Sequence, residues 1–302
     1  MLIVRLGLLA TVVALSGCIW CPGPLLVTAS PDPLAETVDA IVAQYPGATV
    51  AVAVRSPSRR FDRLADRSFH AASTMKVGVM IEAFRQVQAG RRAWDDPVRV
   101  ENRFRSIVDS TEYQITDDSD DGLYALQGQD VTFRTLTERA ITTSSNLATN
   151  LLIGLVTADS VQATMDRLGA PGLRVLRGVE DLKAFEAGLN NATTADALAT
   201  VLEAIRDGRA VSPAADAEMV DILDDQAFNE MIPAGLPAGT RVAHKTGWIT
   251  EIHHDAAIVY PDGAEPYVLV VLTEGLADHD ESARLGAEVA RAVHAAVTGA
   301  AR

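Results

Sequence analysis

A serine and a lysine that would lie one helical turn apart carry the first chemistry suggested by the sequence. In HAASTMKVGVM, Ser73 precedes Lys76 by three residues, and the residues that follow are those of a buried helix. Only three of the 26 lysines and arginines are lysine. Lysine, unlike arginine, is able to lose its proton in a protein, and it is rarely buried without a function. We therefore predict that Lys76 acts as the base, or as a proton shuttle, for a nucleophilic Ser73.

Two further polar motifs follow along the chain. Ser144 and Asn146 open an apolar helical segment, and Lys245, Thr246 and Gly247 lie on a late strand-like segment. Each motif alone has a plain structural explanation, namely a surface-reaching lysine, a helix cap or the end of a strand. Together and in this order, in a chain with three lysines, S-x-x-K, S-x-N and K-T-G favour a catalytic site over coincidence.

The residue types of these motifs fit a nucleophilic mechanism. The positive end of a helix favours the alkoxide form of Ser73. Burial beside a second cation, Lys245, is expected to lower the pKa of Lys76 so that its amine accepts a proton. Ser144 is expected to pass a proton to a departing nitrogen. The predicted catalytic groups are therefore Ser73, Lys76 and Ser144.

A second group of residues is predicted to bind the substrate. An amide side chain orients the lysine and binds a substrate amide, an ammonium and a hydroxyl hold an anionic group, and a glycine leaves room along the strand. The backbone N–H groups of the nucleophile and of the residue after K-T-G form an oxyanion hole. The predicted substrate-binding residues are Asn146, Lys245, Thr246, Gly247 and Trp248.

This trio of motifs resembles that of class A β-lactamases and penicillin-binding proteins, the penicillin-recognising enzyme family. The resemblance spans roughly residues 31–299, and SSNLATNLLI and HKTGW stand in the expected contexts. It implies a class A β-lactamase-like serine hydrolase that forms an acyl-enzyme on Ser73.

The loop that follows the middle motif departs from the family pattern. In class A β-lactamases a glutamate in this loop activates the water that frees the acyl-enzyme, and an arginine and an aspartate pair to bracket the loop. Here Arg177 and Asn191 take the bracketing positions, and an asparagine supplies no ion pair. By its position in the loop we predict Glu180 as the catalytic base, with Glu186, which has the better local match, as the alternative.

The segment after K-T-G carries His253, His254 and Asp255, where many class A enzymes place an arginine for a penicillin-type carboxylate. Adjacent histidines point to opposite faces of a strand. No zinc spacing such as HExxH occurs. DDSDDG, at 117–122, lacks the final acidic ligand of a calcium loop and is interpreted as a solvated turn. No metal site and no cofactor are therefore predicted.

Strand-like segments stand near both ends of the chain, with helical segments between them. This pattern predicts an α/β fold of the α+β type, in which an antiparallel sheet built from both chain ends is flanked by helices and carries an inserted helical subdomain. The active site is expected between the sheet and the helical region. The main predicted segments are strands at 48–56, 60–67, 240–248, 255–260 and 266–274, and helices at 34–45, 73–88, 131–156, 160–168, 194–206, 214–223 and 280–297.

The first residues suggest export. MLIVRLGLLATVVALSGC combines one positive charge, an apolar run and small residues before Cys18, which resembles a bacterial lipoprotein signal. We predict a lipoprotein signal peptide at 1–17, a lipid on Cys18, a proline-rich tether at 18–33 and a hydrolase domain at 34–302. A simple signal peptide with an incidental cysteine is the alternative. The protein is thus expected in the periplasm or at the cell surface, anchored to a membrane.

The sequence leaves three functions open. The first is an exported serine hydrolase that hydrolyses β-lactams through an acyl-enzyme, and the second is a D-alanyl-D-alanine peptidase, that is, a penicillin-binding protein. The third is a lipid-anchored protein that binds β-lactams or peptidoglycan without turnover. The expected partner is a small-molecule β-lactam or a peptidoglycan stem peptide. The net charge of −14 argues against a nucleic-acid partner.

Overall fold

The computed structural model describes residues 32–299. The predicted signal peptide at 1–17 and Cys18 lie outside the described residues. The predicted tether at 18–33 also lies outside them except for its last two residues, and Pro33 already begins helix α1 (Pro33–Val42). Within the described part of the chain, no helix is both long enough and apolar enough to cross a membrane.

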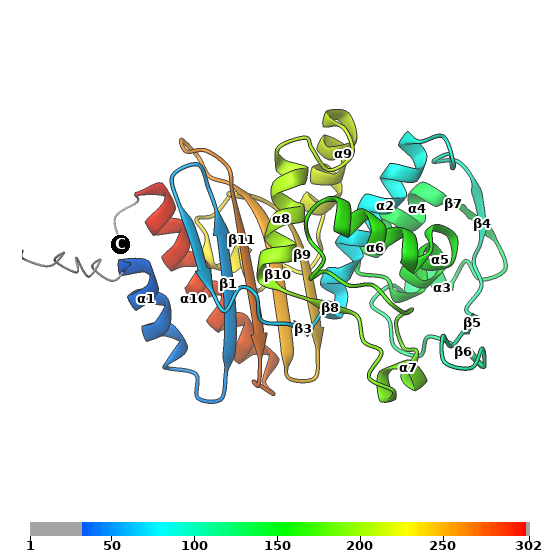
Figure 1. Cartoon of the computed structure of the whole chain (residues 1–302), viewed down its shortest axis with the longest axis horizontal. Helices are drawn as coiled ribbons and strands as arrows, with labels where there is room; N and C mark the ends of the chain where they lie inside the picture. The colour runs from blue at the N-terminus through cyan, green and yellow to red at the C-terminus, as the bar shows by residue number, and fades with distance from the viewer. Residues whose placement is uncertain (1–31, 300–302) are drawn as a thin grey trace, which may run out of the picture. The chain divides into compact units, whose positions relative to one another are not determined.

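A five-stranded antiparallel sheet brings the two ends of the described chain together (Figure 1). The strand order is β2-β1-β11-β10-β9, so the first strand pairs with the last one: Val52 lies opposite Val271. This confirms the predicted sheet built from both chain ends. The strands are β1 (Thr49–Arg55), β2 (Arg60–Arg63), β9 (Arg241–Ile249), β10 (Ile252–Tyr260) and β11 (Tyr267–Glu274).

Strand β1 shows why both faces of the sheet are covered. Alternate residues of a strand point to opposite faces, and in β1 both sets are apolar. Val50 and Val52 pack into one hydrophobic core, whereas Ala51 and Ala53 belong to the other, where small side chains let a helix approach closely. The helices that cover these faces are α1 and α10 (His279–Thr298) on the valine side and α8 (Ala195–Arg206) on the alanine side.

The predicted helical subdomain is present, and it packs around α2 (Lys76–Gln88). Ten residues of this helix are buried, which is typical of a helix enclosed on all sides rather than one with a single apolar stripe. The remaining helices are α3 (Asp121–Tyr124), α4 (Phe133–Thr142), α5 (Asn146–Val156), α6 (Ala158–Arg167), α7 (Leu182–Glu186) and α9 (Pro213–Asp224).

Several predicted segments differ in their bounds from the structure. The helical segment expected over 131–156 is two helices, α4 and α5, because the chain leaves the helical conformation at 143–145, where Ser144 has a left-handed φ of 56°. The strand expected over 255–260 already begins at Ile252. The helix expected over 73–88 begins as a 3-10 helix, η1 (Ala72–Met75), and becomes α-helical at α2. The strand expected over 60–67 ends early, because Leu64 adopts a left-handed φ of 47°. The short elements are β3 (Phe69–His70), β4 (Pro97–Arg99), β5 (Phe104–Arg105), β6 (Glu112–Tyr113), β7 (Asp130–Thr132), β8 (Ala192–Thr193) and η2 (Pro233–Gly235).

Candidate active site

The predicted nucleophile lies where a short helix passes the edge strand of the sheet. Ser73 belongs to η1, and β9 runs so close to it that a β-carbon on Gly247 would lie 2.6 Å from the Ser73 backbone nitrogen. Only glycine permits this approach. Ala72 has a left-handed φ of 45°, a strained conformation of the kind that gathers at functional sites. The predicted oxyanion-hole groups, the N–H of Ser73 and of Trp248, therefore belong to two adjacent segments.

Four polar side chains, those of Lys76, Ser144, Asn146 and Lys245, meet next to this point. Lys76 Nζ, on α2, donates to Ser144 O at 2.5 Å and to Asn146 Oδ1 at 2.8 Å, with Ser144 Oγ at 3.3 Å. Lys245 Nζ, on β9, donates to the same Ser144 Oγ at 3.0 Å. One hydroxyl thus joins the two lysines. Within residues 32–299, neither lysine is hydrogen-bonded to the side chain of Ser73.

Both lysines are fully buried, and burial changes their acidity. Burial lowers the pKa of Lys76 from 10.5 to about 7, although the carboxylate of Asp118 acts in the opposite direction. Burial, followed by the charge of Lys76, lowers the pKa of Lys245 well below its usual value. Lys76 therefore has access to its neutral form near neutral pH, which a general base requires.

The middle motif divides two tasks between its two serines. Ser145 is the N-cap of α5, and its hydroxyl accepts a hydrogen bond from Ala148 N at 3.2 Å. Ser144 precedes the cap with a left-handed φ of 56°, which leaves its side chain outside the helix and between the lysines. The plain explanation considered for Ser144, a helix cap, is therefore wrong, because Ser145 has that role.

Asp118 belongs to the site, although the sequence did not identify it. Its carboxylate accepts hydrogen bonds from the backbone N–H groups of Asn146 and Leu147, both at 2.8 Å, at the N-terminus of α5, where negative charge is favoured. The interpretation of 117–122 as a solvated turn is wrong for this partly buried residue. It is also wrong for Asp120, which is buried and forms an ion pair with Arg139. Asp118 lies 28 residues before the helix that it caps, so no local sequence pattern predicts this contact.

Asn191 replaces the family's bracketing ion pair with hydrogen bonds to the backbone. Its Oδ1 accepts from Leu176 N at 2.8 Å and from Arg177 N at 3.1 Å, and its Nδ2 donates to Arg177 O at 3.0 Å. The Arg177 guanidinium instead donates to Leu189 O and to Asn190 Oδ1, both at 3.1 Å. The two ends of the loop are thus joined without a carboxylate.

Of the two predicted bases, Glu180 borders the cleft and Glu186 does not. Glu180 has a left-handed φ of 58°. Its carboxylate accepts hydrogen bonds from the N–H and hydroxyl of Thr116 at 2.8 and 2.9 Å and from Asp117 N at 3.1 Å. Glu186 is the last residue of α7 and is exposed to solvent.

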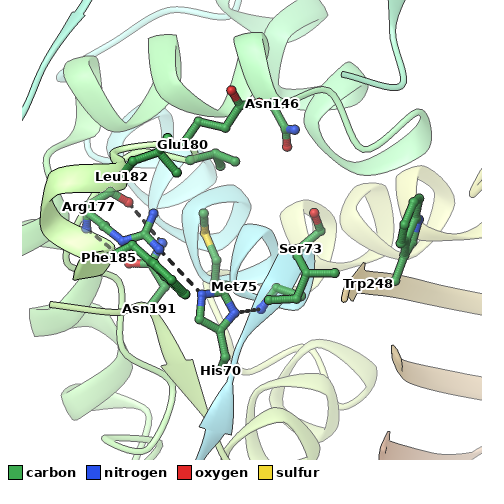
Figure 2. A pocket seen from close by; sticks show the side chains of 13 residues that line it. His70, Ser73, Met75, Asn146, Arg177, Glu180, Leu182, Phe185, Asn191 and Trp248 are labelled. Carbon is green, nitrogen blue, oxygen red and sulfur yellow. Dashed lines mark hydrogen bonds between the residues drawn. The ribbon is translucent and has the colours of Figure 1, made fainter. Parts of the chain in front are cut away.

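Two adjoining cavities, of ≈ 250 and ≈ 520 Å³, open on the nucleophile and together are large enough for a small substrate. Figure 2 shows Ser73 with Asn146 and Glu180 on one side and Trp248 on the other. The residues that line both cavities are Ser73, Asn146, Val179, Glu180, Trp248 and Ile249, and the larger cavity is also lined by Ser144, Thr246 and Gly247.

Two histidines support the turn before Ser73, a role that the sequence did not suggest. His70 Nδ1 accepts from Ala72 N at 3.1 Å. His254 Nδ1 accepts from Thr273 N at 3.2 Å, so its Nε2 carries the hydrogen and donates to His70 O at 2.9 Å. Burial lowers the pKa of both histidines to about 4, and both are therefore neutral at physiological pH.

The residues that replace the family's strand arginine do not border the cleft. His254 supports the turn before Ser73 through its hydrogen bond to His70 O. His253 points to the opposite face, towards Ser282 on α10. Asp255 accepts a hydrogen bond from His244 at 2.9 Å in the interior. Of the K-T-G motif, Thr246 and Gly247 border the larger cavity, whereas Lys245 is fully buried and borders neither.

Residues 33–297 match the family described as the beta-lactamase enzyme family. The chain belongs to this family. This confirms the predicted relationship to class A β-lactamase-like serine hydrolases. Among curated proteins, β-lactamase L2 from Stenotrophomonas maltophilia is 32% identical over 170 residues, which are 54% of this chain and 56% of L2. The chain thus aligns with little more than half of that relative.

Solved structures confirm the fold. A β-lactamase from Sphaerobacter thermophilus is 28% identical, with a TM-score of 0.76, over 89% of this chain and 98% of its own. L2, solved with relebactam, is 25% identical with a TM-score of 0.73 over 86% of this chain and 97% of its own. PBP-A has the same fold, with 24% identity and a TM-score of 0.76 over 88% of this chain and 96% of its own, and a mutant of it was solved as an acyl-enzyme with penicillin G.

Proposed function

We propose that this protein is an exported serine hydrolase that forms an acyl-enzyme on Ser73 and hydrolyses β-lactams. The observation that carries the proposal is the pair of buried lysines that share Ser144 Oγ next to the nucleophile. A structural role does not explain two fully buried lysine side chains whose charged forms repel each other, since burying them costs stability. A proton-transfer role explains both their burial and their common partner.

The first half of the proposed reaction uses these groups in order. A neutral Lys76 uses its two N–H bonds for Ser144 O and Asn146 Oδ1, so its lone pair is left to accept a hydroxyl proton. Ser73 Oγ attacks the lactam carbonyl carbon, Lys76 takes the serine proton, and the N–H groups of Ser73 and Trp248 bind the oxyanion. The C–N bond then breaks, Ser144 gives its proton to the nitrogen, and Lys76 returns one to Ser144.

The second half needs a water molecule activated by Glu180. The carboxylate already accepts three hydrogen bonds from Thr116 and Asp117, which fix its position at the cleft. A carboxylate offers about four acceptor sites, so one remains for a water. That water attacks the acyl carbon while its proton passes to Glu180. The ester bond to Ser73 then breaks, and Ser73 Oγ takes up that proton, which restores the hydroxyl of Ser73 and the carboxylate of Glu180. The substrate carboxylate is assigned to Lys245 and Thr246, which replace the family's strand arginine in this role.

Mass spectrometry of the intact protein after mixing with penicillin G tests the proposal. We expect wild type to gain one acyl group and then to lose it, and Ser73→Ala to lose acylation by at least about 10³-fold. Ser145→Ala is the matched control: it removes a helix cap worth about 1 kcal/mol but should still label. A label that forms on Ser73→Ala contradicts the assignment of the nucleophile.

The same time course distinguishes hydrolysis from the alternative functions. An adduct that forms on wild type and persists for hours would favour a D-alanyl-D-alanine peptidase or a binding protein without turnover. The fold that the chain shares with PBP-A is the observation that favours this alternative. Release of D-alanine from a synthetic D-alanyl-D-alanine peptide would then identify the peptidase.

Export and membrane attachment are part of the proposal, supported by the sequence before the fold begins. The apolar run that ends in Leu15-Ser16-Gly17-Cys18 supports cleavage before Cys18 and lipid attachment to its thiol. Mass spectrometry of the mature amino terminus tests this point. We expect a diacylated Cys18, and a free terminus later in the chain would instead mean ordinary secretion.

A further inference from the structure

His253 presents a buried nitrogen that has no partner. The residue is 2% exposed. Its Nδ1 lies 3.0 Å from Ser282 Oγ, whose own hydrogen is donated to His279 O at 2.8 Å. Ser282 therefore accepts, and His253 Nδ1 carries the hydrogen. Nε2 is left as a bare lone pair, and no hydrogen-bond partner for it exists among the described residues.

Two further groups that can accept a hydrogen bond lie near this lone pair, the carboxylate of Glu230 and the imidazole of His279. Glu230 Oε1 lies 3.8 Å from His253 Nε2 and 3.9 Å from His279 Nε2. The three ligand atoms all lie within 4.8 Å of one another. The two imidazole rings stack with centroids 4.3 Å apart. Lone pairs that converge without a donor are unfavourable, so the position between them suits a cation.

We propose that Glu230, His253 and His279 form a binding site for a divalent transition-metal ion, best fitted to Zn²⁺. Two imidazoles and one carboxylate are a known zinc ligand set, and three protein ligands leave one position for water. The hydrogen bond from His253 Nδ1 to Ser282 is the kind of outer contact that fixes a metal-binding histidine in the right tautomer.

The site needs a small closure around a fixed ligand. Zinc bonds to nitrogen and oxygen are about 2.0–2.2 Å long, so the ligand atoms must move closer than they are now. His253 is locked in β10, but Glu230 is 34% exposed and His279 is 41% exposed. These two side chains are therefore able to turn towards the ion, and solvent gives the ion a route to the site.

The proposed ion would sit against the rim of the cleft. The rings of His279 and Trp248 form a T-shaped pair with centroids 5.3 Å apart, and His253 lies opposite Trp248 in the β9–β10 pairing. Trp248 lines both cavities beside Ser73. Zinc would therefore restrict a side chain of the substrate cleft without touching the nucleophile. This consequence for substrate binding rests on the proposed function, whereas metal binding itself does not.

Equilibrium dialysis of the full chain, made without an affinity tag, against Zn²⁺ alone tests the site. We expect one zinc per wild-type chain, and at least tenfold weaker binding by Glu230→Gln and by His279→Ala. Both substitutions lie on partly exposed side chains, so the fold should survive, and thermal unfolding checks that it does. Glu265→Gln, which removes an exposed carboxylate from another turn, is the charge-matched control and should bind like wild type.

Cobalt offers an independent readout that does not depend on activity. Co²⁺ in the wild-type site should give the visible absorption of a four-coordinate ion, and His279→Ala should lose it. No stoichiometric zinc in wild type would overturn the proposal. Zinc bound equally by wild type, Glu230→Gln and His279→Ala would overturn it as well, because the ion would then lie elsewhere in the chain. Since penicillin acylation is measured separately, neither result depends on the proposed hydrolase activity.

Discussion

Lys76 and Glu180, the two bases of the proposed reaction, are held in different ways. Lys76 is fully buried on α2, at the centre of the helical core, and its partners come from α5 and from the loop before it. Glu180 lies on a loop, in a left-handed conformation, and its contacts are hydrogen bonds to the exposed Thr116–Asp117 segment. Next to it, Asn150 of α5 accepts from Val179 N and donates to Val179 O at 2.9 Å.

This difference separates the two halves of the proposed reaction. The groups for acylation lie in a low-dielectric interior, where charges interact strongly and positions are fixed by packing. The group for deacylation depends on a few hydrogen bonds at the surface, where local opening costs little free energy. Changes in the loop should therefore affect release of the acyl group more than its formation, and changes in the lysine pair should do the reverse.

The largest effect is expected at the buried lysine. Lys76→Arg keeps the charge but removes the base, since arginine does not lose its proton. We expect acylation to fall by about 10²–10⁴-fold, nearly as far as in Lys76→Ala. Stopped-flow acylation by a chromogenic cephalosporin measures it. Lys183→Arg, at an exposed lysine paired with Asp109, is the control. Acylation within a few-fold of wild type in Lys76→Arg would remove the contrast between the two regions.

The next largest effect is expected for Glu180 in the loop, and it concerns the rate of deacylation. Glu180→Gln should acylate at the wild-type rate but release the acyl group about 10²–10³-fold more slowly, because the water loses its base. Rapid-quench mass spectrometry with penicillin G should show the adduct accumulating. Glu186→Gln is the matched control and should turn over normally, since its side chain is outside the cleft. Accumulation in Glu186→Gln alone would reverse the assignment.

The sequence predicted best what depends on local spacing. S-x-x-K places Ser73 and Lys76 one turn apart on any helix, and the strand-like segments near both chain ends predicted an antiparallel sheet flanked by helices. Contacts between distant segments were missed. Asp118 reaches the start of α5 from a separate turn, and nothing near Asn191 in the sequence indicates that its side chain replaces a salt bridge.

The proposed metal site was missed for the same reason. Zinc motifs place their ligands at short spacings along the chain, and His253 next to His254 has no such spacing. The structure adds Glu230 from the segment before η2 and His279 from the start of α10. Only the packing of α10 against the sheet brings these three side chains together, and helix packing is not encoded in local periodicity.

A smaller effect should appear in the pH dependence of the two steps. Burial lowers the pKa of Lys76 to about 7. Below this pH the amine is protonated in the folded protein, so acylation should fall about tenfold per pH unit and should level off above it. The acylation rate of Glu180→Gln, measured from pH 5 to 9, should show the same fall at low pH. If the acylation rate of Glu180→Gln did not fall at low pH, the carboxylate, and not the lysine, would be the group that accepts the serine proton.

The smallest effect is expected from the ends of the loop, and it tests whether the loop affects deacylation without affecting acylation. Asn191→Ala removes three hydrogen bonds that join the loop ends, each worth about 1 kcal/mol, so the free energy of unfolding should fall by about 2–3 kcal/mol. Deacylation should slow by a few-fold, because Glu180 loses part of its support, while acylation should stay near the wild-type rate. Asn190→Ala, which removes a single bond from Arg177, should show a smaller change of the same kind. Single-turnover kinetics with penicillin G separates the two steps. An equal fall in both rates would mean that the loop also positions Ser73, and that the two regions act as one.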